Sequence, residues 1–423
     1  MAQAQVFENK APVLGINSLG RIGKLTLWHH VQRKYFKEII INQGRDVGTG
    51  METIARLIET DATYGLLHRF LYGYKAQPVV KIVDEKNGKL LVDGIPVTVL
   101  RTERNPMNIP WRQYGADIVV DCSGSFKDPT VPADDKKGSI RGHLSGGAKV
   151  VIHSAPFKIK NKALAMPDDT ITLIYGINHT AFNPKKHAVI SAASCTTTGL
   201  AHMVKPLLEN EETSTILTAS MSTIHAVTNT QSVLDKLPKA GEKDIRKTRS
   251  ILNNIILTST GAASALAEVI PEVKSIGFMG DSIRVPTNTL SLIVLNATFQ
   301  AKKSGKSEAA DIDTKKLNNI YEKTAQVNPL VRFTMQQNVS TDLIGEDAAI
   351  IIEGQFNHTR TAFIPVNLAH IPNLPAELLK NLNEKTLQVP VVHAKIFGWY
   401  DNEYGSYTNR MGDLTVYLHK NLL

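Results

Sequence analysis

The feature that most constrains the fold is a glycine-containing turn close to the N-terminus. Residues 13–17 (Val-Leu-Gly-Ile-Asn) form a short apolar run, and apolar side chains recur at helical spacing from Arg21 onward. A second apolar run follows at residues 38–42. A strand, a glycine turn, a helix and a second strand within roughly 30 residues predict a βαβ unit.

Two domains are predicted, because the chain has 423 residues and a single core rarely grows past about 250–300 residues. In the first half, short apolar runs alternate with helical stretches, which predicts an α/β fold with a parallel sheet covered on both faces. After Leu200 the chain is richer in alternating β-type segments, which predict an α+β domain with a mostly antiparallel sheet. We expect a dinucleotide-binding (Rossmann) domain over residues 1–194 and a catalytic domain over 195–397. The runs that carry this prediction are 117–121, 150–152 and 188–190, and then 215–225, 290–301, 348–353 and 391–397.

The composition restricts the cellular location and the kinds of partner that we expect for this protein. Two cysteines, Cys122 and Cys195, exclude a disulfide framework. The first ten residues lack an apolar signal core, and no apolar run reaches the roughly 18–20 residues of a membrane span. We therefore expect a cytoplasmic protein without a membrane partner. The net charge of +9 fits either nucleic-acid binding or an enzyme that handles phosphorylated ligands. The absence of a Lys/Arg run interleaved with aromatics argues against nucleic acid.

The first candidate site is the turn at residues 15–23. A dinucleotide pyrophosphate needs backbone amides at a helix N-terminus with no side chains in the way. Gly20 would permit close approach of the phosphate, and Gly23 would permit close packing of helix on strand. Ser18 stands where the usual pattern has a glycine. The alternative is an ordinary turn between a strand and a helix.

The second candidate is Cys195, in the segment Ser-Ala-Ala-Ser-Cys-Thr-Thr-Thr-Gly-Leu at 191–200. A strand leads into small residues and then into a helical pattern, which would place Cys195 at a helix N-terminus. The dipole there lowers a thiol pKa, and backbone amides can hold an oxyanion. The alternative is a buried structural cysteine.

The third candidate is His225, which ends an apolar strand and could accept the proton of Cys195. A structural role is the alternative, since the chain has 13 histidines. We expect no metal site, because neither an H-E-x-x-H motif nor a cysteine pair is present.

Taken together, these segments resemble the motifs of the glyceraldehyde-3-phosphate dehydrogenase family. The matching segments are Gly-Ile-Asn-Ser-Leu-Gly-Arg-Ile-Gly at 15–23, Ser-Cys-Thr-Thr at 194–197, Ser-Thr-Gly-Ala-Ala at 259–263, Arg-Val-Pro-Thr at 284–287, and Trp-Tyr-Asp-Asn-Glu at 399–403 followed by Asn-Arg at 409–410. They occur in the family's order and extend over nearly the whole chain. The resemblance implies that Cys195 is the nucleophile and His225 its base. It also implies NAD or NADP as cofactor, glyceraldehyde 3-phosphate and inorganic phosphate as substrates, and a homotetramer in which residues 231–249 form an interface loop.

The resemblance also assigns binding residues. Thr228 and Arg284 match the residues that hold the phosphate of the substrate. The residues that match the site of the attacking inorganic phosphate are Ser194, Thr196, Thr260 and Gly261. The residues that match the cofactor site are Gly20, Arg21, Ile22, Gln43, Arg104, Cys122 and Asn402. It further implies that residues 398–423 return as a helix to the first domain.

The chain departs from the family pattern at the expected cofactor carboxylate, where Gln43 stands instead of an aspartate. Such a carboxylate about 20 residues after the glycine turn accepts hydrogen bonds from the adenosine ribose of NAD. Gln43 does not repel a 2′-phosphate, and Arg45 could reach one, so we expect appreciable use of NADP. The alternative is that Gln43 hydrogen-bonds the ribose of NAD.

Three other questions stay open at this stage. A four-carbon relative that oxidises erythrose 4-phosphate shares the motifs, and aspartate-semialdehyde dehydrogenase also combines Cys, His and a nucleotide. A basic nucleic-acid-binding protein with a vestigial Rossmann domain is the alternative outside enzymes. The chain is also longer than the resemblance implies, with extra segments near 302–330 and 365–392 to which the sequence assigns no role.

Overall fold

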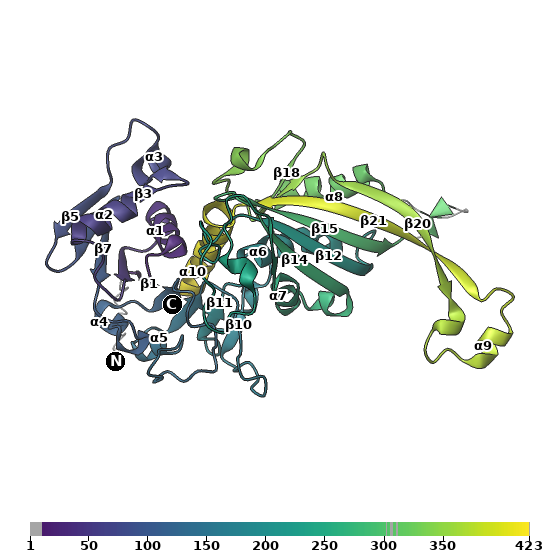
Figure 1. Ribbon diagram of the computed structural model, residues 1–423, viewed down its shortest axis with the longest axis horizontal. Helices are drawn as coiled ribbons and strands as arrows, with labels where there is room; N and C mark the ends of the chain where they lie inside the picture. Colours follow the sequence, from purple (N-terminus) through teal and green to yellow (C-terminus); the bar gives the residue numbers. More distant parts are fainter. Residues whose placement is uncertain (1–10, 302, 305–307, 310–311, 423) are drawn as a thin grey trace, which may run out of the picture. The chain divides into compact units, whose positions relative to one another are not determined.

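The computed structural model describes residues 11–301, 303–304, 308–309 and 312–422 (Figure 1). The chain divides into two compact units, residues 1–195 with 403–423 and residues 196–402. Among the described residues, no helix is long and apolar enough to cross a membrane.

The first unit is built on a nine-stranded sheet in the order β10-β11-β9-β8-β1-β2-β7-β6-β5. The strands from β10 to β7 pair in parallel, and β6 and β5 form an antiparallel edge. The predicted parallel sheet is thus confirmed. Its strands are β1 (Val13–Asn17), β2 (Glu38–Asn42), β5 (Val80–Asp84), β6 (Lys89–Val92), β7 (Ile95–Leu100), β8 (Ile118–Asp121), β9 (Val150–His153), β10 (Thr170–Thr172) and β11 (Val189–Ser191).

Helices cover this sheet because their apolar side chains recur on one side. Helix α1 (Arg21–Arg33) follows β1 directly, and Leu25, Leu27 and Trp28 are fully buried. The C-terminal helix α10 (Asn409–Leu422) packs against α1, where Arg33 donates to the carbonyl of Asn409 at 2.9 Å. The other helices of the unit are α2 (Met51–Glu59), α3 (Leu67–Tyr72), α4 (Trp111–Tyr114) and α5 (Gly142–Ser145), and β3 (Thr60–Asp61) and β4 (Gly65–Leu66) form a small hairpin.

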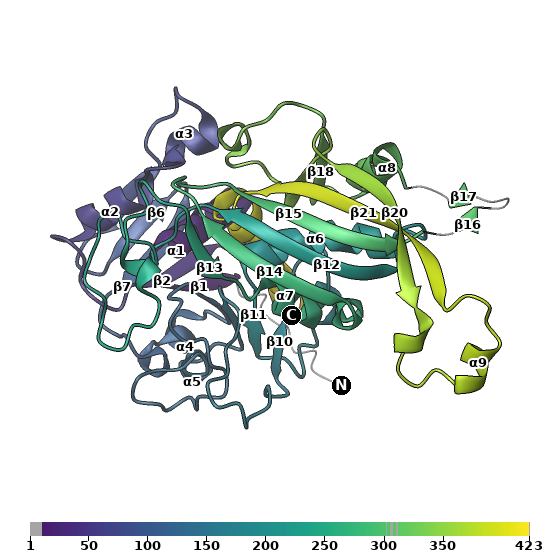
Figure 2. The same cartoon turned by 45° about the vertical axis from the view of Figure 1, so that its right-hand side comes forward.

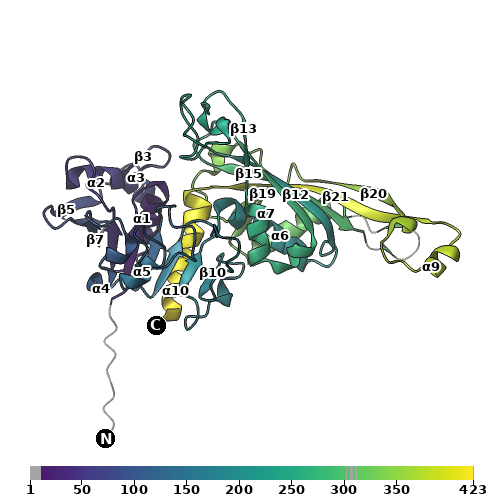
Figure 3. The same ribbon diagram turned by 60° about the horizontal axis from the view of Figure 1, so that its bottom comes forward.

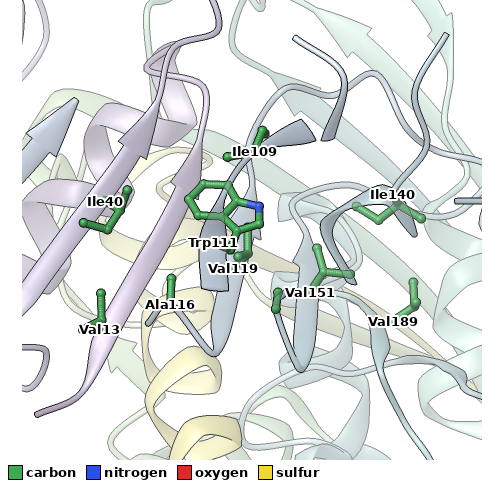
Figure 4. Close-up of a cluster of buried hydrophobic side chains, with 10 residues drawn as sticks. Val13, Ile40, Ile109, Trp111, Ala116, Val119, Ile140, Val151 and Val189 are labelled. Atoms are coloured by element: carbon green, nitrogen blue, oxygen red, sulfur yellow. The ribbon is translucent and has the colours of Figure 1, made fainter. Parts of the chain in front are cut away.

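Trp111 fills part of the core beside β1 (Figure 4). Its indole Nε1 donates to Nδ1 of His143 at 3.0 Å, which satisfies a polar atom that would be costly to bury alone. A Cβ atom on Gly15 would lie 2.9 Å from the indole ring and 2.8 Å from Val119. Glycine is therefore required at position 15, the first glycine of the turn motif, because Trp111 and Val119 pack against its backbone.

The second unit contains an eight-stranded sheet in the order β13-β14-β12-β15-β21-β19-β18, with β20 paired to β21. Most neighbours are antiparallel, while β12 with β14 and β18 with β19 are parallel. Its strands are β12 (Ile216–His225), β13 (Ile256–Ser259), β14 (Gly277–Arg284), β15 (Ser291–Gln300), β18 (Val331–Thr334), β19 (Ile350–Glu353), β20 (His358–Asn367) and β21 (Thr386–Tyr400).

Burial alternates along the strands of this sheet, as expected when helices cover one face. In β15 the odd-numbered residues from Ser291 to Phe299 are buried and the even-numbered ones are half-buried. The helices of the unit are α6, which begins at Cys195 and runs to Glu209, α7 (Ala262–Val269), α8 (Thr314–Val327) and α9 (Ala376–Lys380).

The structure places the two extra segments and corrects one boundary. Residues 365–392 belong to the long ribbon of β20 and β21 with α9 at its end (Figures 1 and 2). Helix α8 lies within 302–330; residues 302, 305–307 and 310–311 of that segment are outside the described residues. The expectation that the chain returns to the first domain from residue 398 is wrong for residues 398–400. They continue β21, which is hydrogen-bonded to β15.

Candidate active site

The glycine turn forms an open helix N-terminus at the start of α1. Ser18 has a φ of 84°, in the left-handed region that costs a non-glycine residue about 1 kcal/mol. Its Oγ accepts from the amide of Gly20 at 3.3 Å. A Cβ atom on Gly23 would lie 1.8 Å from the carbonyl oxygen of Ser18, so only glycine fits there. The backbone amides at the start of α1 suit a pyrophosphate.

A cavity of about 280 Å³ opens beside this turn within the first unit. Gln43 shapes it: its Oε1 accepts from the amide of Leu19 at 3.1 Å, so the side chain is fixed to the turn. Arg45 is exposed and lines the same cavity. The remaining lining residues are Ser18, Leu19, Gly20, Val47, Ile54 and Leu57. Apolar side chains with a few polar groups suit an adenosine moiety, so these residues fit a dinucleotide.

Four other cofactor candidates lie in this unit. Ile22 is half-buried in the first turn of α1, and the remaining three differ in their surroundings. The side chain of Arg21 is held by Asp61 and Glu403. Burial opposes its charge, but the bonds and charges of both carboxylates outweigh burial and raise the pKa of Arg21. Arg104 is exposed in the loop after β7. Burial and then the charge of Asp121 raise the pKa of the Cys122 thiol to about 12, so Cys122 is protonated at neutral pH.

Cys195 is the first residue of the 15-residue helix α6, as predicted. The turn before it contains Ala193 in the left-handed region, with a φ of 55°. This turn is fixed from two sides. The amide of Ala193 donates to Oγ of Ser191 at 3.0 Å, and the carbonyl of Ala193 accepts from the hydroxyl of Tyr407 at 3.2 Å. Ser194 and Cys195 are half-buried, which leaves the thiol partly accessible at the positive end of the helix dipole.

His225 and Arg284 lie together because β12 and β14 are parallel and end side by side, with these two residues in register. The carbonyl oxygen of Ala226 lies 2.7 Å from Nδ1 of His225 and accepts from Nη1 of Arg284 at 3.0 Å. Burial, followed by the charge of Arg284, lowers the pKa of His225 to about 3. The imidazole is therefore neutral at physiological pH and can accept a proton, but a pKa this far below the operating pH makes it a weak base.

Strand β21 brings a third group to the same edge, since β12 and β21 are both antiparallel to β15 and so point the same way. The hydroxyl of Tyr400 lies 2.9 Å from Oγ1 of Thr196 and 2.7 Å from Oγ1 of Thr223. Asn402 follows Tyr400 and is buried, where its Oδ1 accepts from Ser291 at 2.9 Å. The first turn of α6 is thereby joined to the carboxyl ends of β12 and β21.

The other phosphate candidates are not joined to this group by the hydrogen bonds described above. Thr228 is exposed, and its Oγ1 donates to Oε1 of Gln231 at 3.1 Å. Strand β13 is antiparallel to β14, so its last residue, Ser259, pairs with Asp281 and not with Arg284. Thr260 and Gly261 follow Ser259 and are therefore on the side of Asp281 that is away from Arg284. Gly261 is the N-cap residue of α7.

Sequence reasoning missed several residues that shape these sites. Tyr400 lay inside the Trp-Tyr-Asp-Asn-Glu segment, which would have been the available signal for its role. Glu403 is the last residue of the same segment, but the motif does not show its pairing with Arg21, which is 382 positions away in the chain. Asp61 lies in none of the matching segments.

A unit whose glycine turn and cavity fit a dinucleotide, together with a unit that carries a buried neutral histidine, fits the class of nucleotide-dependent oxidoreductases. The family described as "Glyceraldehyde 3-phosphate dehydrogenase, NAD binding domain" matches residues 13–129, and "Glyceraldehyde 3-phosphate dehydrogenase, C-terminal domain" matches residues 194–370. The chain is 32% identical over 419 residues to a glyceraldehyde-3-phosphate dehydrogenase of Streptomyces coelicolor, covering 97% of this chain and 99% of that protein. It is 33% identical over 407 residues to the enzyme of that name from Chlamydia pneumoniae, covering 96% and 98%. The chain belongs to the glyceraldehyde-3-phosphate dehydrogenase family, and NAD(P) is its cofactor.

Proposed function

We propose that the chain catalyses the NAD(P)-dependent, phosphorylating oxidation of glyceraldehyde 3-phosphate to 1,3-bisphosphoglycerate. The observation that carries this proposal is a half-buried cysteine on the first turn of α6 in a chain that also holds a buried, neutral histidine at a strand end. The turn at Gly20 and the cavity beside Gln43 would bind the cofactor.

In the proposed reaction, His225 accepts the proton of Cys195. The thiolate attacks the aldehyde carbon and forms a hemithioacetal. His225 returns the proton to the hemithioacetal oxygen and accepts it again when the hemithioacetal is oxidised to a thioester; the nicotinamide, when bound, would supply the hydride acceptor for this oxidation. Inorganic phosphate then attacks the thioester carbon, the C–S bond breaks, and the acyl phosphate leaves. Nδ1 of His225 lies 2.7 Å from the carbonyl oxygen of Ala226 and 2.6 Å from the donor Nη1 of Arg284. The proposed reaction uses the tautomer with the proton on Nδ1, which would donate to Ala226 and leave Nε2 to act as the base.

Substrate recognition is proposed to depend on two phosphate sites. Thr228 and Arg284 would hold the phosphate of the substrate. The hydroxyls of Ser194, Thr196 and Thr260 and the backbone of Gly261 would hold inorganic phosphate. Hydroxyls, amides and a guanidinium are groups that bind a doubly charged oxyanion well.

The test is an assay of NAD(P)H formation with glyceraldehyde 3-phosphate and with erythrose 4-phosphate, each with and without inorganic phosphate. We expect phosphate-dependent turnover that is faster with the three-carbon substrate. Faster turnover of the four-carbon substrate would replace the proposed substrate, and turnover independent of phosphate would refute the phosphorylating reaction.

Arg284→Leu tests the substrate phosphate site. We expect KM for the phosphorylated aldehyde to rise far more than KM for the unphosphorylated aldehyde, because a guanidinium–phosphate contact is worth about 1.5–3 kcal/mol. Removal of the cation should also raise the pKa of His225, since the charge of Arg284 helps to lower it. Steady-state kinetics with both aldehydes, repeated across pH, measure both effects. Arg332→Leu, at an exposed ion pair with Glu346, is the matched control. Equal effects on both substrates would show that Arg284 does not touch the phosphate.

Cofactor choice is proposed to include NADP. Gln43 is neutral and bound to the turn, and Arg45 lines the same cavity. The nearest carboxylate in the sequence, Asp46, has 87% of its side chain exposed and lies 3.6 Å from Arg101. No carboxylate is therefore among the residues that line this cavity.

Gln43→Asp should shift the preference toward NAD, because a carboxylate in this cavity would repel the 2′-phosphate of NADP at close range. The measurement is kcat/KM for both cofactors in the native protein and the variant. Arg45→Leu is the complementary variant and should weaken NADP use alone. A native preference for NAD above about a hundredfold, or roughly 2.7 kcal/mol, would rule out appreciable NADP use.

We further propose a homotetramer in the cytoplasm. The loop 231–249 has solvent-exposed apolar side chains, including Leu234 at 72% and Leu237 at 91% exposure. Apolar side chains at such exposure are typical of surfaces that a partner covers. Sedimentation velocity of the purified chain tests the assembly state.

A further inference from the structure

The guanidinium of Arg284 lies against the imidazole of His225. Strands β12 and β14 place the two residues side by side, and Nη1 of Arg284 is 2.6 Å from Nδ1 of His225. A guanidinium nitrogen keeps its protons and can only donate. Two N–H donors at 2.6 Å would repel each other, so Nδ1 accepts in this arrangement and the proton of the neutral imidazole is on Nε2. This is not the tautomer that the proposed reaction uses.

The same contact opposes the charge that the base has to gain. Accepting the proton of Cys195 would make His225 a cation beside the permanent cation of Arg284. Like charges in a buried site repel strongly, because little water screens them. While the guanidinium lies on Nδ1, the imidazole therefore has its proton on the wrong nitrogen for the reaction and takes up a second proton with difficulty.

The imidazole is held more firmly than the guanidinium. The ring of Tyr400 packs edge-on against it, with 6.1 Å between the ring centroids. The amide of Ala226 donates to Oγ of Ser291 at 3.1 Å, which fixes the carbonyl beside Nδ1. These groups lie at the ends of β12, β15 and β21, which run side by side in the sheet (Figure 3). Arg284 is half-buried and has a long side chain with many rotamers, so the guanidinium is the part of this contact that can move.

A phosphate group is a stronger partner for Arg284 than the neutral acceptors beside it. Nη1 donates to the carbonyl of Ala226 at 3.0 Å as well as to the imidazole. A phosphate dianion adds opposite charge and can accept two parallel N–H bonds from a guanidinium. The segment after His225 has further donors: the amide and the hydroxyl of Thr228 both donate to Oε1 of Gln231, at 3.0 and 3.1 Å. Two donors that converge on one oxygen also suit a phosphate oxygen.

We propose that Arg284 is a switch that couples binding of the substrate phosphate to activation of the base. When the phosphate draws the guanidinium off Nδ1, the imidazole loses its Nε2 proton to solvent and gains one on Nδ1, which donates to the carbonyl of Ala226, 2.7 Å away. Nε2 then accepts the proton of Cys195, and the negative phosphate compensates the charge of the guanidinium. In this role Arg284 is a positioning residue that acts through His225. This inference rests on the proposed function.

The switch adds a second source of specificity to the binding of the substrate. An aldehyde that lacks a phosphate leaves the guanidinium on Nδ1 and the base inactive. The phosphate of the substrate therefore contributes to the rate of the chemical step as well as to affinity.

The first experiment observes the proton on the imidazole of the native chain in the presence of NAD(P). Nitrogen NMR of isotope-labelled histidine distinguishes protonated from unprotonated Nδ1, and the signals missing from His225→Asn identify His225. We expect the proton on Nε2 before addition of ligand and on Nδ1 after addition of glycerol 3-phosphate, which has the phosphate but no aldehyde. Glycerol at the same concentration is the control and should change nothing. The same tautomer before and after glycerol 3-phosphate would overturn the switch, whichever nitrogen carries the proton.

The second experiment measures the pH midpoint for alkylation of Cys195 by iodoacetamide. An imidazolium stabilises a nearby thiolate, so glycerol 3-phosphate should move the midpoint of the native chain by about one pH unit toward acid. Arg284→Leu should have the acid midpoint without ligand and should not respond to it. Arg332→Leu, at the exposed ion pair with Glu346, should behave like the native chain. A midpoint of Arg284→Leu equal to that of the native chain would show that Arg284 only holds the phosphate.

Neither readout depends on turnover. A ligand that merely covers the thiol lowers the alkylation rate without moving its midpoint. If the proton moves but glyceraldehyde 3-phosphate yields no NAD(P)H, the proposed reaction fails and the control of His225 by phosphate stands. If NAD(P)H forms but the tautomer is the same with and without glycerol 3-phosphate, the reaction stands and the switch fails.

Discussion

Cys195→Ser should lower kcat for aldehyde oxidation by more than about a thousandfold, because the reaction loses its covalent nucleophile. Cofactor binding should be nearly intact, since Cys195 is not among the residues that line the cavity that would hold the adenosine. Turnover measures the first effect and quenching of protein fluorescence by NAD(P)H the second. Activity above about a thousandth of the native value would exclude Cys195 as nucleophile.

Alkylation provides an internal control for this assignment. The chain has a second cysteine, Cys122, whose pKa is raised to about 12 by burial and by Asp121. Iodoacetamide at neutral pH should therefore modify Cys195 and spare Cys122, and peptide mass spectrometry locates the label. Inactivation accompanied by label at Cys122 alone would contradict the proposal.

His225→Asn should lower kcat by about 10²–10⁴-fold, the usual contribution of a general base. It should also raise the apparent pKa of Cys195, seen as an alkaline shift in alkylation rate against pH. An unchanged profile would mean that the helix N-terminus alone sets thiol reactivity.

The pH dependence of the native enzyme follows from the direction of the His225 shift. The pKa of His225 falls from 6.5 to about 3 on folding, so the base stays neutral through mildly acidic pH. As pH falls, the imidazole of His225 is protonated in the unfolded chain at a higher pH than in the folded chain. The contribution of His225 to the free energy of unfolding is therefore fully present above pH 6.5 and is lost as pH falls toward about 3. The free energy of unfolding, measured by denaturation of the native protein and of His225→Asn at several pH values, should fall less at acid pH in the variant.

The sequence predicts the elements well where the signal is local. The β1–α1–β2 unit and the start of α6 at Cys195 follow from runs of a few residues and from turn chemistry. The need for glycine at position 23 also follows from the motif, and the contact with Ser18 gives its physical reason. The roles of the site residues remain predictions.

The parts that could not be predicted depend on distant pairing. The hydroxyl of Tyr400 bridges Thr196 and Thr223, which are 204 and 177 positions away. The long ribbon was assigned no role because its alternation resembles that of any strand, and only the register with β15 shows where the sheet ends. The aspartate expected at position 43 is replaced by an amide that binds the turn itself, which no motif encodes.

The side chain of Ser18 competes with a bound phosphate for a backbone amide of the glycine turn. Its Oγ already accepts from the amide of Gly20, one of the amides proposed to meet the cofactor phosphate. An incoming pyrophosphate must displace this hydroxyl, and a departing one is replaced by it. We expect the serine to weaken cofactor retention and to speed its exchange, so that turnover in this chain is less limited by cofactor release than it would be with glycine at position 18.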